Sequence, residues 1–413
     1  MCFTCAEKFE TTLIMKIFSP GFFKISSFVA VMLPLALKAQ VVGPTGTNTN
    51  GTSANAPRAG APFLTISPDS RSGAMGDAGV ALSPDVNATF WNPAKLAYIE
   101  GENNLSLSYS PWLRRLVPDV SLAYLSYARK LDERKTLGAS LRYFNLGTIE
   151  LVDNLQNPLG SYRPNEFSFD VSFARKFGQD FSLGLTGRYI YSSLTNGSFS
   201  AGQQTKPASA VAADASMYYK KTTQQFGKEA LFAFGVDLSN IGSKIGYTDN
   251  GPKDFLPATL RIGAANTWYI DDYNEFTFAF DISKLLVPLT ITDSNGNVVS
   301  NDQSVPSGIF NSFGEGFSTQ TKQLTYSPGI EYRYNKQFAL RAGYFYQNPL
   351  YGGNQYLTMG AGFKYDNFDI DFSYLAANQQ QSPLSNTLRF SLIVNFGAAK
   401  KTDTKTDNQT GKK

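Results

Sequence analysis

The feature of this sequence that most constrains its fold is a recurring two-residue alternation of apolar and polar side chains. Between residues 167 and 173, for example, Phe167, Phe169, Val171 and Phe173 fall on one face, and Ser and Asp residues fall on the other. Successive side chains of a β-strand point to opposite faces, so this period predicts half-buried strands. We expect fourteen strands, at about 104–110, 119–130, 134–147, 165–177, 180–194, 211–220, 229–241, 256–270, 274–285, 322–335, 338–347, 354–366, 367–375 and 386–397.

The connections between these strands alternate between short and long. Short turns are expected at 130–134, 177–180, 270–274, 334–337 and 366–367, with a looser link before Leu231. Long polar loops are expected at 147–165, 195–211, 242–255 and 286–322. Outer-membrane barrels carry short turns on the periplasmic rim and long loops on the outer rim. The sequence therefore predicts an all-β fold, a 14-stranded antiparallel transmembrane β-barrel, and the even strand number places both termini in the periplasm.

Composition divides the chain into five segments around a single barrel domain. Residues 1–39 have the charged region, apolar run and small-residue cleavage site of a signal peptide, with Met15 as the expected start. Residues 40–62 are expected to be a flexible periplasmic lead-in, because they are rich in Gly, Thr, Asn and Pro. Residues 63–100 are expected to form a plug, because their small and turn-forming residues fit no strand. Residues 101–397 form the barrel, and 398–413 a polar periplasmic tail.

The residue types that are present exclude several classes of function. Aromatic residues make up 14% of the chain, which suits a barrel with two interfacial girdles. The chain has no His, and both of its Cys residues precede Met15, so thiol nucleophiles, disulfides and histidine-based triads are not expected. Asp366, Asp369 and Asp371 lack the spacing and the glycine of a calcium loop. We expect no catalytic residues, no metal and no cofactor, and the near-neutral barrel region gives no reason to expect nucleic acid.

The faces opposite the apolar stripes carry charges of both signs. A pore that sorts ions would favour separated arcs of charge, whereas mixed charges in a low-dielectric interior more often pair with each other and with a plug. We therefore expect structural ion pairs in the lumen. The charged residues at these positions are Glu166, Asp170, Arg188, Asp237, Asp281, Glu331, Arg333, Asp369, Asp371 and Arg389.

Three sequence motifs resemble a known family. The first two, at 68–79 and 91–94, lie in the expected plug, and the third, Tyr109 to Leu113, begins at the end of the first expected strand. Together they resemble the PorV family of type IX secretion system barrels, which lies within the wider FadL-like superfamily, and the resemblance extends to 256–263. The plug residues that carry the likeness are Pro68, Asp69, Arg71, Met75, Gly76, Asp77, Gly79, Asn92, Pro93 and Ala94.

The resemblance implies a function as well as a fold. It implies a FadL-like 14-stranded barrel in the outer membrane of a member of the Bacteroidota. It also implies that the protein accepts secreted cargo proteins by their C-terminal signal domains at the translocon barrel. The cargo would then pass to the surface-attachment components. The expected partners are thus these proteins and the lipid of the outer membrane.

Two of the expected outer loops carry apolar residues that could bind a protein partner. The first loop contains Trp112, Leu113 and Leu116, with arginines between them. The loop at 286–322 contains three phenylalanines among Gly and Ser: Phe310, Phe313 and Phe317. Aromatic residues are favoured interface anchors, and exposed apolar residues on loops commonly mark a partner site. The alternative is that both loops fold over the barrel mouth and pack on each other.

A second function remains open, that of a FadL-like channel for hydrophobic small molecules. In such a channel, a plug would open a path lined by apolar side chains. The inward faces expected here consist mostly of Ser, Gly, Ala, Asp and Arg, which favours the secretion function over the channel.

Overall fold

The structure, a computed structural model, describes residues 57–112, 119–153, 155, 157–195, 197, 199–200, 203–249, 251–288, 302–314, 316–377 and 387–397. All of them belong to one compact unit, Gly43–Lys413. The predicted leader and polar tail, and the predicted lead-in up to residue 56, lie outside the described residues. The helices of the N-terminal part are η1 (Pro62–Thr65), α3 (Ser70–Gly73), α4 (Ala88–Trp91) and η2 (Pro93–Tyr98).

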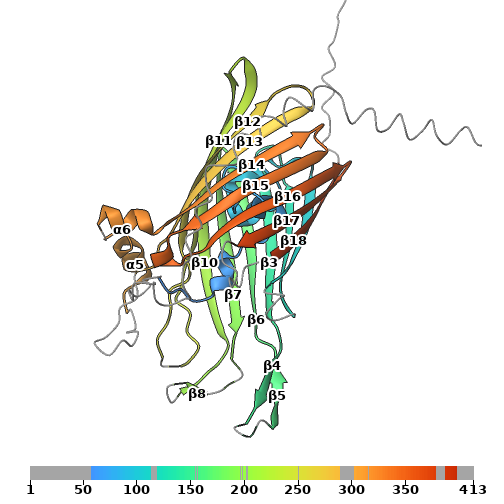
Figure 1. Cartoon of the computed structure of the whole chain (residues 1–413). Coiled ribbons are helices and arrows are strands. Elements are labelled where there is room, and N and C mark those ends of the chain that lie inside the picture. Colours follow the sequence, from blue (N-terminus) through green and yellow to red (C-terminus); the bar gives the residue numbers. More distant parts are fainter. Residues whose placement is uncertain are drawn as a thin grey trace, which may run out of the picture. The chain divides into compact units, whose positions relative to one another are not determined.

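Fourteen antiparallel strands form one closed barrel (Figure 1). Each strand pairs with its neighbours in the chain, and β1 closes the barrel against β18 with a register that runs from Asn103↔Phe396 to Tyr109↔Phe390. The predicted fold and strand number are confirmed. The barrel strands are β1 (Asn103–Pro111), β2 (Val120–Lys130), β3 (Lys135–Leu146), β6 (Asn165–Lys176), β7 (Phe181–Ser193), β10 (Ala208–Gln225), β11 (Lys228–Gly242), β12 (Thr259–Tyr269), β13 (Asn274–Leu285), β14 (Leu324–Tyr334), β15 (Phe338–Gln347), β16 (Gln355–Tyr365), β17 (Phe368–Ala377) and β18 (Thr387–Phe396).

The link before Leu231 differs from its prediction. It was expected to be looser than the other short turns, but Gln225 pairs directly with Lys228 across a two-residue turn. Both turn residues, Phe226 and Gly227, have positive φ angles of 54° and 73°. Such turns match the right-handed twist of a hairpin, and Asn-Gly is their usual sequence. Phe226 is an unusual residue at this position, so the turn was missed, and β10 continues about five residues beyond its predicted end.

The two faces of the barrel wall differ in polarity. On β6, Phe169 and Phe173 are 48% and 40% exposed on the outside, whereas Ser168, Asp170 and Ser172 are buried inside. A continuous apolar outer surface is expected where lipid surrounds the barrel. Closure of the sheet pairs the backbone groups of every strand, which a hydrocarbon environment requires.

The long loops add structure of their own at one rim. The loop after β3 forms the hairpin β4 (Ile149–Val152) and β5 (Pro158–Tyr162), and the loop after β7 contains β8 (Phe199–Ser200) and β9 (Gln203–Gln204). The loop after β13 contains α5 (Val305–Asn311) and α6 (Phe317–Lys322), and η3 (Pro349–Tyr351) follows β15. Among the described residues, no helix has both the length and the apolar character needed to cross a membrane.

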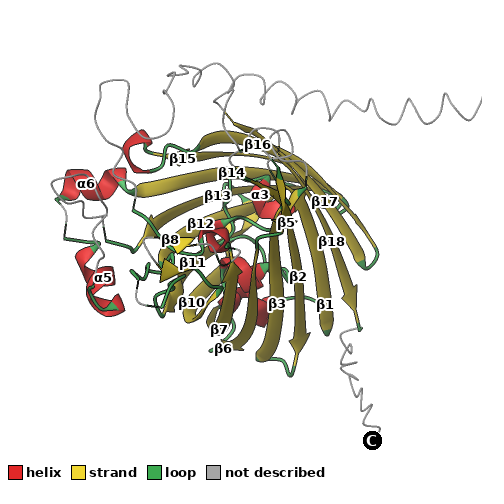
Figure 2. Cartoon of the chain, turned by 90° about the horizontal axis from the view of Figure 1, so that it is seen from below, coloured by secondary structure: helices red, strands yellow, loops and turns green. Residues whose placement is uncertain are grey.

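Residues 57–101, here called the inner segment, lie within the ring of strands (Figure 2). Its helix η2 contacts β3, β6, β7 and β10, whereas α3 contacts β16, β17 and β18. These two groups of strands lie on different sides of the closed barrel. The inner segment therefore reaches across the lumen from one wall to another.

Candidate functional site

The helix α3 of the inner segment is fixed by Asp69. Asp69 caps α3, because its carboxylate accepts a hydrogen bond from the Ser72 N–H at 2.9 Å. The same carboxylate accepts from the indole N–H of Trp91 at 2.6 Å, which ties α3 to α4. Burial raises the pKa of Asp69, and the nearby carboxylate of Asp85 raises it further. Pro68 lies buried directly before this cap.

Arg71 joins the inner segment to a chain of charges on the barrel wall. Its guanidinium contacts Glu331 on β14 at 3.2 and 3.1 Å and Asp85 at 3.2 Å. Glu331 also accepts from Arg341 on β15 at 2.6 Å, and Arg341 donates to Asp371 on β17 at 2.5 Å. All five side chains except Asp85 are almost fully buried. The alternating signs satisfy each charge in turn, as buried charges require.

The motif around Met75 and Gly76 packs its backbone directly on the wall. A Cβ placed on Gly343 of β15 would lie 2.1 Å from both the amide nitrogen of Gly76 and the carbonyl carbon of Met75. Gly76 has a φ of 71°, and it donates its N–H to Thr358 Oγ1 at 2.8 Å. Thr358 donates in turn to the Ala74 carbonyl at 2.9 Å. Glycine is needed on both surfaces, because a side chain on either would separate them.

The end of this motif docks on β13, β16 and β18. Asp77 accepts from the Tyr356 hydroxyl at 2.5 Å and pairs with Arg389 at 3.4 Å. The N–H groups of Gly79 and Val80 both donate to one oxygen of Asp281, at 2.7 and 2.9 Å. The buried carboxylate of Asp281 thus lies at the end of the motif, where it accepts hydrogen bonds from two backbone N–H groups.

The second motif docks on the opposite wall. Asn92 donates to the carbonyls of Val80 and Met217, at 3.0 and 2.9 Å, and its side chain caps η2 by accepting from the Ala94 N–H. A Cβ on Gly184 of β7 would lie 2.4 Å from the Ala94 nitrogen and 2.7 Å from the Pro93 carbonyl carbon. The residues singled out in the inner segment thus sit at its contacts with the wall, where they have a packing role.

Charges on the wall itself also pair, as predicted. Arg188 lies between Asp170 and Asp214, at 2.7 and 2.9 Å, and Arg261 pairs with Asp237 at 3.1 Å. Glu166 differs, because it accepts from the Ser192 hydroxyl at 2.7 Å and forms no ion pair within the described chain.

Arg142 on β3 was missed by the sequence analysis. It is 1% exposed, it donates to the carbonyls of Phe63 and Leu64, and it lies 4.4 Å from the centre of the Phe90 ring. Its position on the inward face of its strand follows from the alternation. The alternation was therefore enough to predict that Arg142 faces the lumen. Its contacts with the inner segment depend on the fold and could not be predicted from the strand alone.

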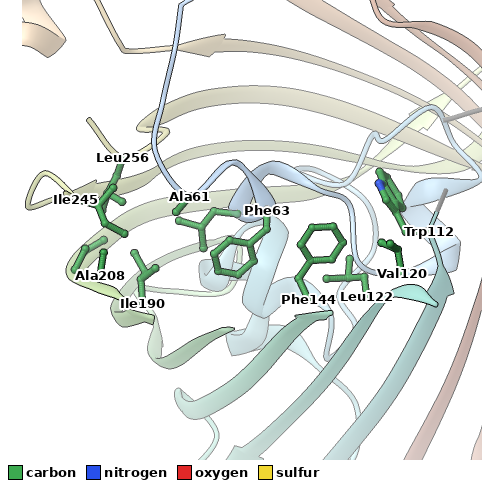
Figure 3. Close-up of a cluster of buried hydrophobic side chains, with 13 residues drawn as sticks. Ala61, Phe63, Trp112, Val120, Leu122, Phe144, Ile190, Ala208, Ile245 and Leu256 are labelled. Atoms are coloured by element: carbon green, nitrogen blue, oxygen red, sulfur yellow. The ribbon is translucent and has the colours of Figure 1, made fainter. Parts of the chain in front are cut away.

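An apolar cluster lies between the inner segment and the inner face of the wall near the long-loop rim (Figure 3). Phe63 of the inner segment lies at its centre, near Phe144 of β3 and Leu122 of β2. Trp112 belongs to this cluster and is only 9% exposed, so it is not part of an open surface. Leu113 and Leu116, the other anchors expected in this loop, lie outside the described residues.

The other expected anchors lie on α5 and α6, which project to one side of the barrel (Figures 1 and 2). Phe310 and Phe317 are 75% and 85% exposed, and Phe313 is 48% exposed beneath the ammonium group of Lys284 at 5.4 Å. Gly308 seats α5 on the ring of Phe255, where a Cβ would approach within 2.7 Å. The helices are thus held at the rim while two phenyl rings face outward.

Comparison with solved structures finds similar barrels at low sequence identity. The toluene transporter TodX of Pseudomonas putida gives a TM-score of 0.47 at 14% identity and covers 80% of this chain and 99% of its own. The monoaromatic hydrocarbon channel CymD gives a TM-score of 0.45 at 14% identity, and the match covers 80% of this chain and 98% of CymD. A FadL homologue of Pseudomonas aeruginosa gives a TM-score of 0.42 at 12% identity, and the match covers 80% of this chain and 99% of the homologue.

Comparison with curated proteins finds no match. Residues 49–292 match the profile of the family described as "Type IX secretion system protein PorV". This range includes the inner segment and the strands from β1 to β13, which is more than half of the chain. The chain therefore belongs to the PorV family of type IX secretion system proteins, which are barrels of the outer membrane.

Proposed function

We propose that this outer-membrane barrel binds secreted cargo proteins by their C-terminal signal domains at the type IX translocon barrel and passes them to surface-attachment components. Membership of the PorV family supports a role in this system. The observation that carries the binding role is the pair of phenylalanines, Phe310 and Phe317, which face outward on helices held at the long-loop rim. Outward aromatic rings are common anchors of protein interfaces.

The topology that we propose places the long-loop rim outside the cell and both termini in the periplasm. An even number of strands brings the two ends of the barrel to the same rim. That rim carries the short turns, which face the periplasm in outer-membrane barrels. Phe310 and Phe317 would then be presented to proteins that have already reached the cell surface.

We also propose that residues 63–100 act as a plug that closes the lumen. Support comes from contacts with opposite walls, through Arg71 and Glu331 on one side and Asn92 and Met217 on the other. A folded protein domain cannot pass through a barrel so occupied. Handover of cargo would therefore take place at the outer surface and not through the lumen.

The competing role, a channel for hydrophobic small molecules, receives less support from the interior. A path for apolar solutes needs an apolar lining, but the wall around the inner segment is crossed by buried ion pairs such as Arg71–Glu331 and Arg188–Asp170. Moving an uncharged apolar solute past these groups would displace polar partners without replacing them.

The test is binding of a purified cargo signal domain to the native barrel. A Phe310→Ser/Phe317→Ser double variant should bind at least about thirtyfold more weakly, because truncation of an anchoring aromatic typically costs about 2 kcal/mol or more. Phe226→Ser provides the matched control, because Phe226 is 93% exposed at a turn on the opposite rim. All variants should keep the heat-modifiable mobility of an intact barrel.

The same variants can be tested in cells. With the double variant, secreted cargo should accumulate in the periplasm while uptake of hydrophobic solutes stays normal. Normal export combined with reduced solute uptake would favour the channel and defeat the secretion role.

A further inference from the structure

Beside the apolar cluster, with which it shares Trp112, the lumen contains a cavity of about 400 Å³. It lies between the inner segment and the inward faces of β12 to β18, and residues at the start of β14 and in the loop after β15 line its long-loop end. This volume is within the range of about 300 to 1,000 Å³ that is usual for small-molecule sites. The wall of the cavity carries polar side chains as well as aromatic ones, whereas the cluster beside it is apolar.

Three residues of this wall have a buried side-chain atom without a partner among the described residues. They are Ser67, at its hydroxyl, Asp281, at Oδ1, and Arg389, at Nε. Arg389 uses only Nη1, toward Asp77, and Asp281 uses only its other oxygen, toward the inner segment. Buried polar groups are normally paired, so open donors and an open acceptor around one cavity indicate a polar occupant.

The arginines around the cavity already have acidic partners. Arg261 is paired with Asp237 and Arg389 with Asp77, whereas Asp281 accepts from two backbone N–H groups through Oδ2 and leaves Oδ1 open. An anion would therefore meet no unpaired arginine and would face the carboxylate of Asp281. The occupant that these groups favour is uncharged and carries hydroxyls, which both donate and accept hydrogen bonds.

The aromatic side chains of the wall narrow the chemistry further. Phe345 and Tyr356 stack with ring centres 4.7 Å apart and an interplanar angle of 5°, and both line the cavity together with Trp112. The C–H face of a sugar ring packs on an aromatic ring while its hydroxyls both accept and donate hydrogen bonds. A hydrocarbon would fill the same volume but would leave the buried donors unpaired.

We propose that this cavity binds a neutral carbohydrate of one or two sugar rings. The site is separate from the exposed phenylalanines of α5 and α6, and sugar binding does not depend on the cargo-binding role. The ligand enters from the long-loop rim, where Tyr351 and Asn354 of the β15–β16 loop form part of the lining.

The experiment uses intrinsic tryptophan fluorescence of the full-length barrel in a detergent without a sugar headgroup. The chain has three tryptophans, and Trp268 stacks on Phe276 away from the cavity. In a Trp268→Phe background, only Trp91 and Trp112 report, and both line the cavity. Titration with cellobiose, lactose, mannobiose and diacetylchitobiose should give a saturable change with at least one of them.

Two serine variants separate a ligand contact from a general effect on the barrel. Ser327→Ala removes a hydroxyl that lines the cavity and should weaken the sugar about tenfold. Ser168→Ala is the matched control, because Ser168 is also buried, faces inward and has no partner, but does not line the cavity. A second lining variant, Phe345→Leu, should also weaken binding while the heat-modifiable mobility stays normal.

Three outcomes would overturn the proposal. The first is the absence of a saturable signal with every disaccharide. The second is equal affinity in the Ser327→Ala and Ser168→Ala variants. The third is saturation by toluene or by trialanine, but by no sugar, which would assign the cavity to an apolar ligand or a peptide instead.

Discussion

Arg71 of the inner segment and Glu331 of β14 form a two-point ion pair, with Nε–Oε2 and Nη2–Oε1 distances of 3.2 and 3.1 Å, although 260 residues separate them in the chain. Arg333 and Arg341 share the same carboxylate, at 2.8 and 2.6 Å. The buried carboxylate of Glu331 thus pairs with one arginine of the inner segment and with two arginines of the barrel wall. Its removal would leave two buried cations, Arg71 and Arg341, without their common partner.

Glu331→Gln should therefore release the inner segment from the wall. Breaking a buried ion pair by removing one partner costs about 3 to 5 kcal/mol. The purified wild-type barrel should conduct poorly in planar bilayers, and the variant should show higher conductance and a lower unfolding temperature. Glu275→Gln is the control, because Glu275 contacts Arg333 at 3.7 Å in a less buried pair that contributes little. A large steady conductance of the wild-type barrel would contradict the plug.

Gly343→Ala should displace the backbone of Met75 and Gly76. The new Cβ would lie 2.1 Å from the Gly76 nitrogen, and overpacking of this kind typically costs about 1 to 3 kcal/mol. Proteolysis of the inner segment should become faster while strand content is retained. Gly187→Ala on β7 is the control, because nothing lies within 4 Å of its Cβ position. Equal proteolysis of both variants would show that the close approach at Gly343 does not hold the segment.

Lys95 should give barrel stability a pH dependence in the alkaline range. Burial lowers the pKa of Lys95 to about 8 from an ordinary value of 10.5, while its ammonium donates to the Gly79 carbonyl at 2.6 Å. Between these two pH values, the unfolded chain binds more protons than the folded one, so stability rises with pH. The free energy of unfolding should rise by about 3 kcal/mol over this range. The gain is complete above pH 10.5 and is lost as the pH falls to 8.

Lys95→Met removes this titration and should flatten that part of the curve. The measurement is the denaturant midpoint at a series of pH values between 7 and 11, compared between the two proteins. Since tyrosines also titrate in this range, the difference between the curves isolates the contribution of Lys95. Parallel curves would mean that the Lys95 site is not as dry as the structure indicates.

The proposed topology predicts which loops can be labelled on intact cells. An epitope inserted near Pro207 or Ser294, both in long loops, should react with an antibody without permeabilisation. An epitope after Lys413 should react only after the outer membrane is opened. Labelling of the C-terminal epitope alone on intact cells would reverse the topology.

The strands could be predicted because each carries its own pattern. In β6, the alternation of Phe169 and Asp170 with their neighbours fixes both the strand and its facing without reference to the rest of the chain. Lumen charges such as Arg188 followed from the same alternation. Their partners could be expected only as a class, because pairing of Arg188 with Asp170 and Asp214 depends on register.

Loop residues are harder to place, because their burial, like the pairing of the lumen charges, depends on residues that are distant in the chain. Trp112 and Phe310 look alike in sequence, as aromatic residues next to one aliphatic residue in an expected outer loop, yet one is 9% exposed and the other 75%. Burial of Trp112 depends on Phe63, Leu122 and Phe144, which come from distant parts of the chain. The cavity also escaped sequence reasoning, because its wall is assembled from seven strands and the inner segment.

Closure of the barrel between β1 and β18 has a consequence for how the chain is assembled during biogenesis. The inner segment is synthesised before every strand, but its partners Glu331, Thr358 and Arg389 belong to strands near the end of the chain. The segment must therefore remain unanchored on that side until the last third of the protein has been made. Only seven residue pairs join β1 to β18, compared with twelve between β6 and β7. The β1–β18 pairing is thus the shortest in the barrel. If it forms last, the inner segment can enter the lumen between these two strands before the barrel closes.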